Sequence, residues 1–147
     1  MNKRILRACI CLITLIIVCC CSKEDMVTSR IYSIPRDLMV ETTDNQILVV
    51  NSEKDFEKYF NTINSKLPKG EKLASIDFKK NTLIYVQGVS NNGISEIKSS
   101  MNTDATPNVL SIDIKQSYTT VLERWNVAYL INKQENPSIK LECRIGQ

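Results

Sequence analysis

Cysteine is the residue type in this sequence with the clearest capacity for chemistry, and its six copies are unevenly placed. Five of them lie within the first 21 residues, and the sixth is Cys143. The chain has no histidine. Ser-His-Asp triads, Cys-His dyads and every zinc site that uses histidine are therefore excluded.

The N-terminal cysteines follow a segment with the order of a secretory signal. Lys3, Arg4 and Arg7 precede an apolar stretch over residues 8–18. That stretch is too short to cross a hydrocarbon core, which needs roughly 20 residues in a helix, but it has the length of the apolar part of a signal peptide. We therefore expect residues 1–20 to be a signal peptide that is removed on export.

The end of the apolar stretch resembles a lipobox, where a signal peptidase cuts before a cysteine that carries diacylglycerol. Val18 gives the aliphatic residue at −3, Cys20 stands where a small residue is usual, and Cys21 is the predicted lipidated residue. Cys20 is the alternative site of lipidation. The implied partner is a membrane, because two or three acyl chains anchor a protein stably.

The four residues after Cys21 are Ser22, Lys23, Glu24 and Asp25. Together with the cysteine they resemble the export signal of surface lipoproteins in Bacteroidota. The resemblance implies display on the outer face of the outer membrane, while a solvated tether of mixed charge is the alternative interpretation.

Cleavage would change the charge of the chain. The sequence has 19 Lys and Arg against 16 Asp and Glu, and the three bases of the signal would leave with it. The mature chain is then formally neutral, so its charge gives no reason to expect a nucleic acid partner. Cys143 would be the one cysteine left with a free thiol, so no internal disulfide could form.

Hydrophobic patterning predicts one domain over residues 31–147, joined to the lipid by a tether at 21–30. Ser52 and Asp55 form a near capping box before a helix at 53–67, whose apolar residues recur at helical spacing. From Ile76 onward the apolar residues alternate with polar ones, in segments separated by short turns. Asn91-Asn92-Gly93 predicts a β-hairpin turn. The predicted fold class is α+β, mostly β: an antiparallel sheet, as a sandwich or open barrel, packed with one amphipathic helix.

Few residues in the mature chain could carry catalysis. Four acidic residues on the predicted strands could converge on one sheet face and act as a carboxylate pair: Glu96, Asp113, Glu123 and Glu142. Basic residues alternate with them, so cross-strand ion pairs on a solvated face are the simpler interpretation. The glycines form no phosphate-binding loop, and no calcium loop is present, so we expect no cofactor and no metal.

Contact residues are expected mainly in loops. Tyr118, Thr119 and Thr120 lie between two predicted strands, and Asn91, Asn92 and Gly93 lie between two others. These two loops are the candidate binding residues, although both would also serve as plain turns. Trp125 and Tyr129 share a strand face, where core packing is favoured over a carbohydrate platform. Cys143 alternates with apolar neighbours and is expected to point inward as a small hydrophobe.

The segment from Ile76 to Gly88, followed by Asn92 to Ile97, resembles the C-terminal domain of the protease-complex subunit PrcB. That family has an aliphatic strand ending in glycine and then a glycine-containing turn, with a helix where 53–67 lies here. This chain has one glycine, Gly93, where the family has more, and it lacks the aromatic residue that usually follows. The resemblance implies a domain that binds a partner without catalysis, and it transfers no site residue.

These observations together predict a surface-anchored lipoprotein with a non-catalytic, macromolecule-binding domain. A protease inhibitor, or an immunity lipoprotein directed against a secreted toxin, is a more specific form of the same hypothesis. The competing hypothesis is a glycan-binding accessory protein or a carboxylate-based hydrolase that uses the outward acids together with Trp125.

Overall fold

The computed structural model describes residues 29–41 and 47–146. The predicted signal peptide, Cys21 and the export signal at residues 22–25 lie outside the described residues. Within the described ranges, no helix is long and apolar enough to cross a membrane.

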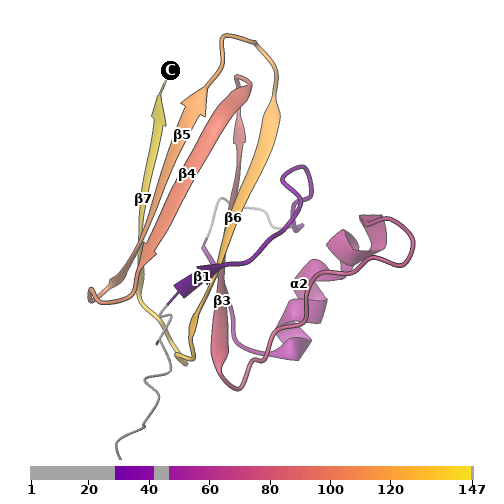
Figure 1. The fold of residues 1–147 in the computed structure, drawn as a ribbon, viewed down its shortest axis with the longest axis vertical. Coiled ribbons are helices and arrows are strands. Elements are labelled where there is room, and N and C mark those ends of the chain that lie inside the picture. Colours follow the sequence, from indigo (N-terminus) through magenta and orange to yellow (C-terminus); the bar gives the residue numbers. More distant parts are fainter. Residues whose placement is uncertain (1–28, 42–46, 147) are drawn as a thin grey trace, which may run out of the picture.

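The described residues form three layers, with one helix, a four-stranded sheet and a three-stranded sheet (Figure 1). Sheet A has the strand order β1-β6-β3-β2 and sheet B has the order β4-β5-β7. Helix α2 lies against the face of sheet A that sheet B leaves uncovered. The α+β, mostly β prediction is confirmed. The elements in chain order are β1 (Ser29–Ile31), β2 (Leu48–Val50), α2 (Glu53–Lys66), β3 (Asn81–Ser90), β4 (Ile94–Asn102), β5 (Asn108–Gln116), β6 (Glu123–Asn132) and β7 (Ile139–Gly146).

Sheet A is buried on both faces because it lies between the other two layers. Leu83 and Tyr85 of β3 face the helix, whereas Ile84 and Val86 face sheet B. All four are at most 1% exposed. This explains why β3 is a continuous apolar run instead of an alternating one.

The predicted helix is also confirmed. Ser52 caps it by accepting a hydrogen bond from the backbone N–H of Asp55 at 3.1 Å. The apolar residues Phe56, Phe60 and Ile63 face sheet A and are buried. Phe60 meets the ring of Tyr85 edge-on at a centroid distance of 5.2 Å, which seats the helix on β3.

The predicted hairpin at residues 91–93 is wrong. β3 and β4 belong to different sheets, because both edges of β3 are occupied by β2 and β6. A two-residue hairpin turn would need residues with positive φ. Among the described residues, only Gly70 has a positive φ. The 91–93 turn instead carries the chain from one sheet to the other.

The sheets are not wholly antiparallel either, because β7 runs parallel to β5. Each strand from β3 to β7 reverses the direction of the one before it. Since β6 crosses into sheet A, β5 and β7 become neighbours that point the same way. The alternation in the sequence correctly predicted the strands, but it could not indicate this crossing.

One side of the two-sheet sandwich is nearly closed, and the other side is open. β1 pairs with β6, and the Ser29 hydroxyl donates to the carbonyl oxygen of Met101 in β4 at 3.1 Å. Ser29 and Arg30, which were expected in the tether, therefore belong to the fold. On the opposite side, β2 covers only Leu83 to Tyr85 of β3.

Candidate binding surface

The two loops predicted as binding loops meet at one end of the sandwich. The backbone N–H of Gly93 donates to the carbonyl oxygen of Thr119 at 2.9 Å, and the N–H of Ser117 donates to the carbonyl oxygen of Gly93 at 2.7 Å. A Cβ at position 93 would overlap the hydroxyl oxygens of Ser117 and Thr119. Glycine is therefore needed here for the close approach of the two loops.

Side chains at the base of the loops add further bonds between them. The Asn92 side-chain amide donates to Oε1 of Gln116 at 3.1 Å, and the Gln116 amide donates to the Ser90 hydroxyl at 2.8 Å. These two bonds fix the ends of β3 and β5 relative to each other. Within the loop after β5, the hydroxyls of Ser117 and Thr119 also form a hydrogen bond at 2.7 Å.

Glu123 belongs to this end of the molecule and not to a cluster of acids. Its Oε2 accepts a hydrogen bond from the N–H of Ile94 at 2.6 Å, and its Oε1 lies 3.6 Å from Nη1 of Arg36. Both contacts bridge elements, since Ile94 begins β4 and Arg36 lies after β1. The alternative in which all four acids converge on one sheet face therefore fails at Glu123.

The most exposed apolar side chains of the loop lie beyond this base. Tyr118 is 94% exposed, Leu122 is 69% exposed and Val121 is 53% exposed. Thr119, Thr120 and Asn91 are exposed as well, whereas Gly93 is buried. We call this group the distal loop surface: Asn91, Tyr118, Thr119, Thr120, Val121 and Leu122.

Sequence reasoning found the tyrosine and both threonines but missed Val121 and Leu122. The sequence does indicate them, because these two apolar residues stand directly before a strand that starts with the polar residues Glu123 and Arg124. Apolar residues next to a strand are ordinarily assigned to that strand, which concealed their exposure. Grouped exposed apolar residues are typical of interaction sites.

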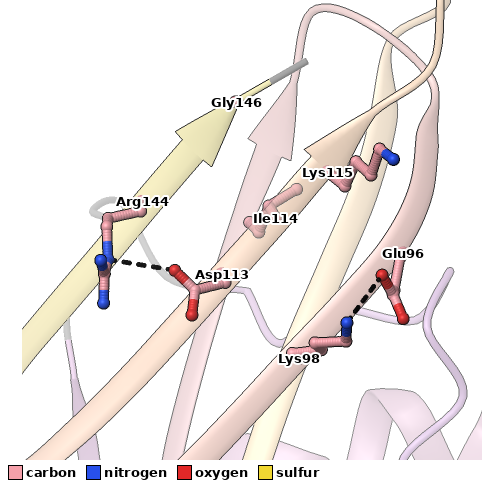
Figure 2. Close-up of a pocket in the computed structure, with 7 residues that line it drawn as sticks. All are labelled: Glu96, Lys98, Asp113, Ile114, Lys115, Arg144 and Gly146. Carbon is pink, nitrogen blue, oxygen red and sulfur yellow. Dashed lines mark ion pairs between the residues drawn. The ribbon is translucent and has the colours of Figure 1, made fainter.

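The charged outer face of sheet B holds a shallow hollow of about 300 Å³ (Figure 2). Glu96 and Asp113 lie there, and each is paired with a base: Lys98 Nζ is 3.2 Å from Glu96, and Arg144 Nε is 3.1 Å from Asp113. The expected ion-paired, solvated face is confirmed for these residues. A group of three or more side chains able to hold a metal is absent from the part of the chain that the structure describes.

Glu142 lies on the same face and is also paired. The Lys140 ammonium donates to its carboxylate at 2.7 Å. That hydrogen bond, the Lys140 charge and the nearby Arg144 lower the pKa of Glu142. A general acid in glycoside hydrolysis needs the opposite shift.

Trp125 and Tyr129 are each 5% exposed and pack between the two sheets. Their predicted role in the core is confirmed, and neither ring is available as a carbohydrate platform. The Trp125 ring lies against Gly88 of β3, where no side chain competes for the space.

Cys143 is exposed, so its expected burial is wrong. Its register partner is Ile112, which is fully buried, so the cysteine does lie on the inner face of sheet B. The reason for its exposure is the open side of the sandwich. β2 ends its pairing at Tyr85, and no further described strand of sheet A pairs with that edge of β3.

We expect a maleimide reagent to label Cys143 in the folded protein, at a rate that keeps rising above the ordinary thiol pKa of about 8.5. Partial burial and the Asp113 carboxylate raise the pKa of this thiol, so less thiolate is present at neutral pH. Asp113→Asn should accelerate labelling near pH 8 by less than about threefold, because an exposed charge is screened by solvent. Peptide mapping by mass spectrometry gives the rate at Cys143, and protection until unfolding would contradict the exposed position.

No family model matches this chain, and no curated protein or solved structure matches it either.

Proposed function

We propose that this protein is a cell-surface lipoprotein, anchored through Cys21, whose domain binds another protein through the distal loop surface without catalysing a reaction. The observation that carries the proposal is that backbone hydrogen bonds join two separate loops at their base. Beyond this base, Tyr118, Val121 and Leu122 are exposed. A preformed loop loses less conformational entropy on binding than a flexible one. Tyrosine is also among the residues that contribute most to protein interfaces.

The position of the surface suits an anchored protein. β1 starts at Ser29, which pairs with Ile131 near the end of β6. The distal loop surface lies at the opposite end of the strands, where Ser90 pairs with Glu123 (Figure 1). A tether attached at Ser29 therefore leaves the loops unobstructed.

A protruding loop with an aromatic residue best fits a concave protein surface such as the cleft of a protease or a toxin. The competing hydrolase and glycan-binding hypotheses have less support. The acids on sheet B are ion-paired, and Trp125 is buried in the core.

The anchor predicts a clear division between two sets of variants. Cys21→Ala should leave the protein without acyl chains. Because the signal peptidase cuts before a lipidated cysteine, this variant should also keep residues 1–20. Replacing Lys23, Glu24 and Asp25 together by alanine should keep the protein in membranes but remove it from the cell surface. The intact mass of the purified protein and protease shaving of whole cells measure the two effects separately.

The matched control for these variants is Lys98→Ala, an exposed change on sheet B that should alter neither result. Lipidation and cleavage of Cys21→Ala, with Cys20→Ala left unprocessed instead, would move the anchor to Cys20. Shaving of the triple-alanine variant at the wild-type rate would contradict the export signal.

The binding proposal can be tested with a photo-cross-linking amino acid at Tyr118 in the full-length, anchored protein. We expect a discrete covalent adduct with one protein on irradiation of cells. The same group at Lys58, on the exposed side of helix α2, should give no matching adduct. Equal adduct patterns at the two positions, or no adduct at Tyr118, would contradict binding through these loops.

A further inference from the structure

β7 offers an edge of regular strand without a neighbour among the described residues. It is eight residues long and ends the strand order of sheet B. Its inner face carries Leu141, Cys143 and Ile145, of which Cys143 is exposed and Ile145 is 53% exposed. An edge of this kind is a template for pairing with another strand.

The outer face of β7 carries a pattern of charges that is complementary to itself. Lys140, Glu142 and Arg144 alternate in sign and point to solvent. When two identical strands pair antiparallel about a two-fold axis, each residue faces one fixed residue of the other copy. The charges therefore decide which registers are allowed.

Four registers with two-fold symmetry pair most of the residues of the two β7 strands. In all four, the outer faces of the two copies of sheet B lie on the same side. Those centred on Glu142 or Arg144 bring like charges together. The register centred on Leu141 pairs Lys140 with Glu142, but it leaves Ile145 opposite Pro137, outside the strand. The register centred on Cys143 pairs Glu142 with Arg144 twice.

The register centred on Cys143 also covers Ile145, the exposed apolar residue of β7. It places Ile145 of each copy beside Leu141 of the other, and Leu141 already packs against the core between the sheets. Arg144 lies 3.1 Å from Asp113 of its own chain, and its guanidinium has enough donors for a second carboxylate.

We propose that two copies of this protein associate through their β7 edges, antiparallel and centred on Cys143, with Glu142 of each copy facing Arg144 of the other. The interface is a single pair of strands, smaller than the standard size of stable complexes. The dimer is therefore weak in dilute solution and is favoured by concentration on a membrane. The proposal does not depend on the distal loop surface, which lies at opposite ends of the dimer.

The test uses the full-length, membrane-bound protein and a short bis-maleimide, which joins two thiols without any oxidant. Directly opposed residues in antiparallel strands have Cα atoms about 4.5–5.5 Å apart, so the wild-type protein should give a dimer linked at Cys143. Cys143→Ser should give none. Glu142→Arg and Arg144→Glu each bring like charges together twice, and each should lower the yield about tenfold.

The decisive sample is a mixture of the two charge variants carrying different tags. In the mixed dimer every pair is again of opposite charge, so the hetero-dimer should cross-link at about the wild-type yield. A folding defect cannot produce this rescue, because the same two proteins are present. Lys140→Glu should leave the yield unchanged, because position 140 faces Gly146 of the other copy.

Three results would overturn the proposal. The first is an absence of wild-type dimer, and the second is a mixture that cross-links no better than its components. The third is loss of the dimer in Lys140→Glu while Arg144→Glu keeps it, which would establish the register centred on Leu141.

Discussion

Gly88→Ala should destabilise the domain by roughly 1–3 kcal/mol, the cost of inserting a methyl group into a packed core. A Cβ at position 88 would overlap ring carbon Cζ2 of Trp125 and lie 2.6 Å from its Cε2. The indole is 5% exposed and packs between two sheets, so it has little room to move. Denaturant unfolding measures the free energy, and emission from Trp125, the single tryptophan, reports its displacement.

The matched control is Gly146→Ala, where a Cβ would meet nothing within 4 Å. It should change the free energy of unfolding by less than about 0.5 kcal/mol. Trp125→Phe in the Gly88→Ala background should recover part of the loss, because a smaller ring leaves room for the methyl group. Equal stability of the two alanine variants would show that Trp125 does not fill this space.

Gln87→Leu should cost roughly 2–5 kcal/mol, because it leaves several buried polar groups without their partner. Gln87 is 4% exposed. Its Oε1 accepts from the N–H of Val40 at 2.9 Å and from the Tyr85 hydroxyl at 2.7 Å, and its Nε2 donates to the carbonyl oxygen of Val40 at 3.0 Å. Leucine fills a similar volume but provides none of these bonds.

Tyr85→Phe serves as the graded control for Gln87→Leu. It removes one of the same hydrogen bonds and leaves Val40 paired, so a loss of about 1 kcal/mol is expected. Thermal unfolding of both variants gives the comparison. If Gln87→Leu lost no more stability than Tyr85→Phe, the hydrogen bonds between Gln87 of β3 and Val40 would contribute little to the stability of the domain.

The elements that could be predicted from the sequence are those whose pattern is local. The helix at Glu53–Lys66 has its cap and its apolar spacing within a few residues, and β3 has an apolar run that only a doubly covered strand explains. Which strands become neighbours is a long-range property. Alternation in β4 and β7 indicates a covered face but does not indicate which sheet a strand joins. The hairpin at 91–93 was therefore wrong, and the parallel pairing of β5 with β7 was not predicted.

The same distinction explains the candidate surface. Tyr118, Thr119 and Thr120 were predicted to be exposed because they interrupt two strands. The contact of Thr119 with Gly93 depends on β3 and β5 ending side by side in different sheets, which no local pattern indicates. Cys143 shows the converse, because its inward direction was predicted correctly while its exposure depends on how far the opposite sheet extends.

The most direct test of binding through the distal loop surface is the affinity of the protein captured at Tyr118. The double variant Tyr118→Ala, Leu122→Ala should weaken binding at least about thirtyfold, as expected when two central contacts are lost. Ile31→Ala removes an equally exposed apolar side chain at the other end of the domain, and it should bind within about twofold of wild type. Biolayer interferometry measures all three dissociation constants. Wild-type affinity in the double variant, or an equal loss in Ile31→Ala, would contradict the account.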